Sequence, residues 1–185
     1  MASGEQGYTR YLNGDKSGID DIVREYNDSL IFFINGYVND LMTAEDLAAD
    51  TIVKLLVKRK KFKNDMGAGF KTWLFTVARN TALDWLRKTA RHPHTPISDS
   101  EQYDLPSFED KMLKTEQAKQ LHSAMDKLCN DSREVLHLLY FEELSYADAA
   151  CVMHKNEKQI KNLAYRAKQS LKTVLEKEDF IYENL

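Results

Sequence analysis

The sequence predicts an all-α protein of two small helical domains joined by a flexible linker, and three observations lead to this fold class. Hydrophobic residues make up 43% of the 185 residues, which is enough to build buried cores. Only 3 prolines and 7 glycines occur, fewer than a turn-rich β fold needs. Apolar residues recur every three or four positions over long segments, which is the period of an amphipathic helix.

The linker is predicted at 91–110, because all three prolines (Pro93, Pro96 and Pro106) fall there among serines and aspartates. Proline interrupts helices, and polar residues keep the backbone solvated. The segment is longer than the loops that usually connect helices inside one compact domain. It therefore separates a first domain at 8–90 from a second domain at 111–180.

Three helices are predicted in the first domain. Apolar residues at helical spacing from Ile19 to Tyr37 predict the first helix, which breaks before residue 40. Thr43 is predicted to cap the second helix, with Asp46 as its capping-box partner. A basic, glycine-bearing loop is predicted at 58–69, and a third helix follows from about Phe70 to Lys88.

The second domain is predicted to contain a helix-turn-helix. Two helices are expected around 118–128 and 135–139. Ser145 can cap a short third helix, and Asn156, with Gln159 three residues later, can cap a longer fourth helix. Only the turn at 154–155 separates the third helix from the fourth, which is the spacing of a helix-turn-helix.

The net charge of −3 conceals an uneven distribution. Nine acidic residues and two basic ones lie between Asp15 and Asp50, whereas eleven basic residues and two acidic ones lie between Lys54 and Arg91. A chain with one acidic and one basic surface is typical of a protein that binds two partners of opposite charge.

Two segments have the composition of nucleic-acid-binding surfaces. The last predicted helix divides into an apolar face and a face of lysines and amides, which suits contacts to phosphates and base edges in a major groove. A lysine-rich, solvated surface helix is the simpler alternative. Between Lys60 and Lys88, cations alternate with aromatic residues, a pattern that suits single-stranded nucleic acid. Phe70 and Trp85 lie on the apolar face there and are expected in the core.

Three runs of residues resemble extracytoplasmic-function (ECF) RNA polymerase sigma factors. The run from Phe70 to Lys88, FKTWLFTVARNTALDWLRK, resembles the promoter-melting segment of that family. The run at 44–56 resembles its polymerase-binding helix. The run at 144–150, together with the Arg-Ala pair at 166–167, resembles the helix-turn-helix of its second domain. Their order along the chain, with a linker between them, makes the resemblance specific.

The resemblance implies a sigma factor, not an enzyme, that directs bacterial RNA polymerase to promoters and opens them. The implied partners are core RNA polymerase, promoter DNA as duplex and as melted non-template strand, and an anti-sigma factor. The residues expected to bind polymerase are Glu45, Asp46, Leu47, Asp50 and Lys54. Those expected to bind melted DNA are Lys63, Asn64, Lys71, Trp73, Arg79, Asn80, Asp84, Arg87 and Lys88. Those expected to bind the upstream promoter element are Lys155, Asn156, Lys158, Gln159, Lys161, Asn162, Tyr165, Arg166 and Lys168.

The sequence departs from the family pattern in its second domain. His154 stands where a glycine is usual in the turn, and Leu163 and Ala164 stand where the family often has polar residues. These departures put in doubt which bases are read. The departure at Leu163 and Ala164 keeps open a degenerate sigma-like protein that binds polymerase only, and a helix-turn-helix regulator that acts without polymerase is the other alternative.

Other patterns carry little functional information. Cys151 and His154 have metal-like spacing but lack a second ligand pair, which favours a buried thiol over a zinc site. No phosphate-binding loop or catalytic constellation occurs, so neither a cofactor, a metal nor an enzymatic activity is expected. The absence of any run of eighteen apolar residues predicts no membrane contact and a cytoplasmic location.

Overall fold

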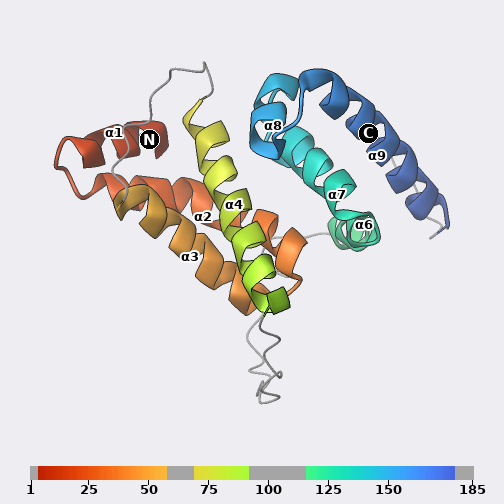
Figure 1. Cartoon of the computed structure of the whole chain (residues 1–185), viewed down its shortest axis with the longest axis horizontal. Helices are drawn as coiled ribbons and strands as arrows, with labels where there is room; N and C mark the ends of the chain where they lie inside the picture. The colour runs from red at the N-terminus through yellow and green to blue at the C-terminus, as the bar shows by residue number, and fades with distance from the viewer. Residues whose placement is uncertain (1–3, 58–68, 92–115, 178–185) are drawn as a thin grey trace, which may run out of the picture.

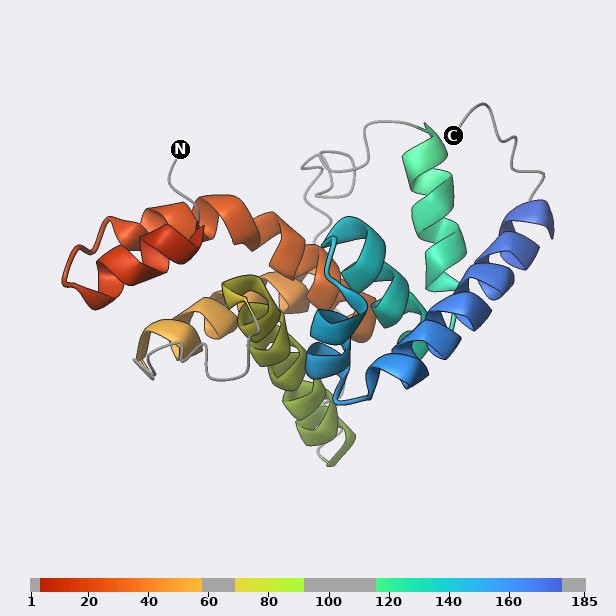
Figure 2. The same cartoon turned by 90° about the horizontal axis from the view of Figure 1, so that it is seen from above.

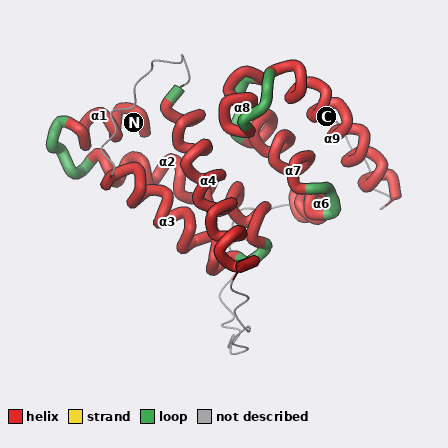
Figure 3. Tube along the Cα trace, viewed as in Figure 1, coloured by secondary structure: helices red, strands yellow, loops and turns green. Residues whose placement is uncertain are grey.

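The structure is a computed structural model that describes residues 4–57, 69–91 and 116–177. These residues form helices and short loops, which confirms the all-α prediction (Figure 3). The predicted loop at 58–69, apart from Gly69, and the predicted linker at 91–110, apart from Arg91, lie outside the described residues. In chain order the elements are α1 (Gly4–Leu12), α2 (Gly18–Val38), α3 (Leu41–Val57), α4 (Phe70–Arg91), α6 (Glu116–Asp126), α7 (Asn130–Leu136), the π-helical turn η2 (His137–Phe141), α8 (Tyr146–Met153) and α9 (Glu157–Lys177).

Helices α1 to α4 form the first half of the molecule, with α2 packed against the other three (Figure 1). The apolar stripe predicted on α2 is its buried face, where Ile22, Leu30 and Ile34 are fully buried. Leu55 of α3 and Leu74 of α4 complete this part of the core. Burial of these helical stripes accounts for the three helices predicted from the sequence.

The junction of α2 and α3 corrects one prediction. Asn39 ends α2 in the left-handed conformation with φ of 55°, and α3 begins at Leu41. The Asp40 carboxylate accepts a hydrogen bond from the Thr43 backbone N–H at 2.8 Å. Asp40 therefore caps α3, and the prediction that Thr43 caps it was wrong. Aspartate caps at least as well as threonine, and it stands one residue before the helix starts.

Helix α1 was not predicted from the sequence, because its residues are mostly polar or glycine. Its Tyr8 ring is buried, and its centroid lies 5.2 Å from that of Phe70 and 5.5 Å from that of Trp73. Helices α1 and α2 approach closely because both carry glycine at the contact. A Cβ atom on Gly7 would lie 2.6 Å from the Gly18 carbonyl oxygen.

This close approach predicts that Gly7→Ala lowers the free energy of unfolding by about 1–3 kcal/mol, because the added methyl group meets backbone that cannot move aside. Thermal and urea denaturation followed by circular dichroism measure the change. Gly69→Ala is the matched control, since a Cβ atom there meets nothing within 4 Å. Equal stability of the two variants would contradict this account of the α1–α2 contact.

The helix caps predicted in the second half are confirmed. The Ser145 hydroxyl accepts a hydrogen bond from the Asp148 backbone N–H at 3.0 Å, at the start of α8. Asn156 and Gln159 form a reciprocal capping box before α9, since each backbone N–H donates to the other side chain at 2.8 Å. Between them His154 ends α8 with φ of 53°, so the turn forms without the usual glycine.

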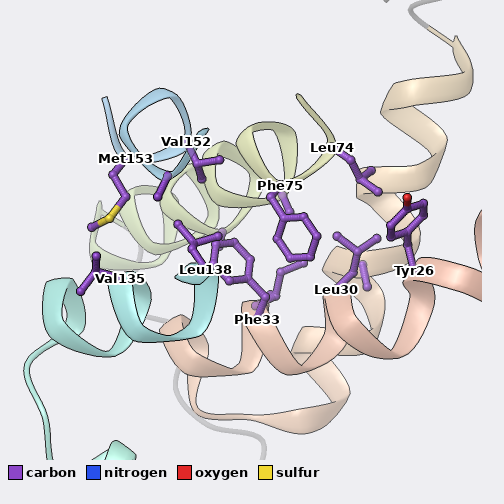
Figure 4. Close-up of a cluster of buried hydrophobic side chains, with 14 of the residues drawn as sticks. Tyr26, Leu30, Phe33, Leu74, Phe75, Val135, Leu138, Val152 and Met153 are labelled. Atoms are coloured by element: carbon purple, nitrogen blue, oxygen red, sulfur yellow. The ribbon is translucent and has the colours of Figure 1, made fainter. Parts of the chain in front are cut away.

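The two halves pack against each other along α4 and α8 and along α2 and α7 (Figures 1 and 2). Phe33 and Phe75 of the first half lie against Leu138 and Val152 of the second half (Figure 4). The centroids of the Phe33 and Phe75 rings are 5.1 Å apart, edge to face, and the His137 ring lies 5.3 Å from Phe33. We call this contact between the two halves the seam.

Candidate nucleic-acid and polymerase interfaces

Helix α3 presents an exposed face that combines acidic and apolar side chains. Glu45, Asp46 and Asp50, all predicted to bind polymerase, are exposed. The other two predicted residues are not free: Leu47 lies in the core, and the half-buried Lys54 ammonium donates to the Thr81 hydroxyl at 3.0 Å.

Apolar side chains on the same face of α3 were missed from the sequence. Met42 and Val57 are 76% and 74% exposed, and Val53 is 52% exposed. Positions 42, 46, 50, 53 and 57 share one side of a helix, because they recur at three- and four-residue spacing. This spacing could have revealed the face. An exposed apolar stripe interrupted by carboxylates fits a protein partner with apolar and basic residues.

Helix α4 carries two different surfaces. Asn80, Asp84, Arg87 and Lys88 are exposed on α4, where the sequence predicted a polar face. The Asp84 carboxylate accepts from the Arg87 guanidinium at 2.8 Å, so this pair orders part of the exposed surface. The predicted DNA-binding residues Lys63 and Asn64 lie outside the described residues.

The remaining predicted residues of α4 lie against other parts of the protein. Trp73 is partly buried, and its ring contacts those of Tyr8 and Phe70, at 5.5 and 5.9 Å. Lys71 and Arg79 lie at the seam, where both cations meet carboxylates of the second half. The Arg79 Nε donates to a Glu134 carboxylate oxygen at 2.6 Å, and the Glu134 side chain is only 3% exposed.

Lys71, the second cation of the seam, has two acceptors on Glu142. The Lys71 Nζ lies 2.9 Å from the Glu142 carboxylate and donates to the Glu142 backbone carbonyl at 2.7 Å. The same carboxylate lies 3.2 Å from Nε2 of His137, which is also buried. Thr72, the residue that follows Lys71 on α4, donates its hydroxyl hydrogen to the Asp148 carboxylate at 2.9 Å.

The two carboxylates of the seam respond differently to burial. Burial raises the pKa of Glu134, and the Arg79 guanidinium only partly offsets this effect. Burial also acts to raise the pKa of Glu142, but the His137 ring and the Lys71 ammonium outweigh it and hold that pKa below its usual value. Glu142 is therefore the better compensated of the two charges.

Helix α9 presents the predicted face of cations and amides. Some of these side chains are held by other described residues, and others are not. Lys158, Asn162, Tyr165 and Arg166 are exposed, and the described residues offer them no hydrogen bond or ion pair. Asn156 and Gln159 are committed to the capping box, although both remain exposed.

Three lysines of this region are held by neighbours. Lys155 lies 3.2 Å from the Asp131 carboxylate, and Lys161 lies 2.6 Å from that of Glu157. The Lys168 Nζ lies 4.8 Å from the centroid of the Tyr140 ring, and Lys161 lies similarly over Tyr146 at 5.7 Å. Such cation–π contacts fix the direction of a surface cation without neutralising its charge.

The departures from the family pattern have a structural explanation. Leu163 and Ala164 are buried, so they mainly pack α9 onto the core. The prediction that Cys151 is a buried thiol was wrong, because Cys151 is exposed on α8. Within the described residues, no group of three metal-ligating side chains comes together, and no helix is both long and apolar enough to cross a bilayer.

Two sigma-70 family profiles match the chain in the order in which its halves occur. Sigma-70 region 2 matches residues 8–92, and sigma-70 region 4 matches residues 118–171. The chain is 30% identical to the RNA polymerase sigma factor YlaC of Bacillus subtilis over 162 residues, which are 85% of this chain and 91% of that relative. It is also 30% identical to the ECF RNA polymerase sigma factor SigM of Bacillus subtilis over 158 residues, 84% of this chain and 94% of SigM. The chain is an ECF sigma factor.

Solved structures agree with this assignment. The sigma factor RpoE of Bartonella quintana, in complex with the anti-sigma factor NepR, superposes with a TM-score of 0.65 at 25% identity, covering 86% of this chain and 98% of that one. CnrH in complex with the cytosolic domain of CnrY shares the fold, with a TM-score of 0.66 at 20% identity over 95% of this chain and 98% of CnrH.

In this sigma factor, the two asparagines of the helix-turn-helix are predicted to have separable roles. Asn156→Ala removes a cap and should lower the free energy of unfolding by about 1 kcal/mol, which corresponds to a fall in Tm of about 2–4 °C. Asn162→Ala should leave Tm unchanged, because that side chain has no described partner, and should weaken binding to promoter duplex. Thermal denaturation and fluorescence anisotropy measure the two effects. A loss of stability in Asn162→Ala would contradict this division.

Proposed function

We propose that this sigma factor binds core RNA polymerase through the exposed face of α3, captures melted promoter DNA with α4, and contacts the upstream promoter element with α9. It acts by binding and not by catalysis, and it works in the cytoplasm, where polymerase and DNA meet. One observation supports the proposal most: a region 4 helix-turn-helix with an exposed cationic face follows a region 2 domain whose α4 keeps an exposed polar face.

The division of labour follows from the chemistry of each surface. The apolar and acidic face of α3 suits a basic protein surface and repels DNA phosphates. The free cations and amides of α9, Lys158, Asn162 and Arg166, suit a major groove. Asn80 can hydrogen-bond a base edge, and the glycines in the sequence just before α4 allow close approach of backbone to a base.

A protein inhibitor is a further proposed partner. The Bartonella quintana relative was crystallised with the anti-sigma factor NepR, and its fold covers most of this chain. The exposed faces of α3 and α9 are the surfaces that such a protein would need to cover, since they carry the proposed polymerase and DNA contacts.

Run-off transcription with purified core polymerase and a pool of genomic promoter fragments tests the proposed function. We expect transcripts only when this sigma factor and core polymerase are both present. A helix-turn-helix regulator acting without polymerase would bind duplex DNA but support no transcription. A degenerate sigma-like protein would bind core polymerase and support none.

Reversing one charge on α3 is predicted to weaken polymerase binding. Asp46→Lys should raise the Kd for core polymerase several-fold to about tenfold, because it places a cation against a basic partner surface. The circular dichroism spectrum should not change, since Asp46 is exposed. Asp28→Lys, an exposed acid on α2, is the matched control and should bind normally. Equal affinities of the two variants would remove α3 from the polymerase interface.

Removing the amide of Asn80 is predicted to impair promoter opening specifically. Asn80→Ala should reduce open-complex formation by about tenfold or more, since one base contact contributes about 1–3 kcal/mol. Binding to polymerase and to duplex promoter should stay nearly unchanged. Permanganate reactivity of melted thymines measures the defect, and a premelted template shows whether base capture is the affected step. Full activity of Asn80→Ala on a closed promoter would show that Asn80 is merely solvated.

A further inference from the structure

Two cations of α4 at the seam have competing partners, carboxylates within the chain and the phosphates of melted DNA. Lys71 and Arg79 belong to the α4 residues that the family pattern assigns to melted DNA, yet both are held by carboxylates of the second half. Arg79 pairs with Glu134, whose side chain is almost completely buried, and Lys71 has both a carboxylate and a carbonyl of Glu142 as acceptors. In this arrangement the Arg79 side chain, only 14% exposed, is committed to Glu134, and the Lys71 ammonium, on a side chain that is 34% exposed, is drawn toward Glu142.

Further contacts hold the two halves in register. The Thr72 hydroxyl reaches Asp148 at 2.9 Å, and on the other side of the seam the Arg133 guanidinium donates to the Gly36 carbonyl at 2.8 Å. The aromatic rings of Phe33 and Phe75 close the middle of the seam against the second half (Figure 4). The contacts come from α2, α4, α7 and α8, so they define one arrangement of the halves.

The seam also contains polar groups that a permanent core would satisfy. Among the described residues, the buried Arg133 Nε has no hydrogen-bond partner, and the buried Tyr37 hydroxyl lies beside the Arg79–Glu134 pair without a well-formed hydrogen bond to it. Both line a hollow at the seam between α2 and α7. Buried polar atoms are nearly always paired in stable interiors, and polar, imperfectly packed contacts are typical of domain interfaces that open.

The surfaces proposed for first recognition stay accessible while the seam is closed. Asp46 and Asp50 on α3 are exposed, and so are Lys158 and Arg166 on α9. The closed seam therefore restricts the part of α4 that carries Lys71 and Arg79 and leaves these four residues exposed. The segment 92–115 is long enough to let the halves separate, since it can span up to about 80 Å when extended.

We propose that the seam is an autoinhibitory contact, in which Glu134 and Glu142 occupy the cations of α4 that bind the melted promoter strand, so that the two halves must separate before the promoter opens. The proposal rests on the proposed function. Carboxylates and phosphates bind the same cations through the same charge-assisted hydrogen bonds, so one excludes the other. The apparent affinity for melted DNA is then reduced by the fraction of molecules that are open.

A reversible crosslink across the seam, called the lock, tests the proposal. In a background where Cys129 and Cys151 are serines, Thr72→Cys and Asp148→Cys are joined by a short, reducible thiol-to-thiol crosslinker. The crosslinked protein should form open complexes at least tenfold less well than the same protein after dithiothreitol treatment. Single-cysteine variants treated with the reagent are controls for the modification itself. If the crosslinked protein opens promoters as well as the reduced protein, the seam is not inhibitory.

Loosening the seam from its second-half side should produce the opposite effect. Glu134→Ala leaves Arg79 without its carboxylate, so the halves should separate more often, and open complexes should form several-fold faster. Small-angle X-ray scattering should show a larger radius of gyration. Glu143→Ala, an exposed acid close to the seam, is the matched control and should match the wild type. If Glu134→Ala proves unfolded by circular dichroism, Glu134→Gln, which keeps the shape and removes the charge, takes its place.

The outcomes separate this proposal from the function on which it rests. Inactivity of the wild type with core polymerase would overturn the proposed function. An active wild type whose lock does not inhibit, or whose release variant neither expands nor accelerates opening, would overturn the autoinhibitory contact alone. Inhibition by the lock together with acceleration by Glu134→Ala supports it, because a gain in rate cannot come from damage to the fold.

Discussion

The arrangement of this sigma factor depends on one buried contact between its halves, the pairing of Arg79 with Glu134. A partly buried guanidinium and a buried carboxylate each lose hydration, and their attraction offsets that loss only while both are present. The pair therefore adds little net stability, but it penalises any arrangement that separates the charges without rehydrating them. The Phe33–Phe75 contact supplies the apolar area beside it, and the ion pair determines which residues face each other.

The same balance makes the seam reversible. Opening exposes both charges to water, which returns their hydration energy, whereas a fully apolar seam would have nothing comparable to recover. The Glu134 carboxylate is less well compensated in the closed seam than the Glu142 carboxylate, since burial raises the pKa of Glu134 while His137 and Lys71 compensate Glu142. One carboxylate of the seam is thus less fully compensated than the other, which suits a contact that both forms and breaks.

Local features of the fold could be predicted from the sequence, and long-range ones could not. The capping box of Asn156 and Gln159 involves residues three apart, and spacing alone revealed it. The cap of α3 was misassigned because Asp40 and Thr43 are both good caps, and only the start of the helix distinguishes them. Helix α1 escaped prediction because its packing uses Gly7 and not an apolar stripe. The candidate site was predicted as a set of residues on α3, α4 and α9. The sequence did not show which of these side chains are held by other residues of the protein.

The seam explains why charge distribution alone was an incomplete guide. The sequence places a surplus of cations at 54–91, and this surplus suggested an acidic partner such as nucleic acid. Two of those cations, Lys71 and Arg79, already have acidic partners within the chain, 71 and 55 residues further along. Sequence composition cannot distinguish an internal carboxylate from an external phosphate, because both satisfy the same cation. The ambiguity is physical and not only one of prediction, because the carboxylate and the phosphate compete for the same cations of α4. The position of the second half decides which of the two anions binds them.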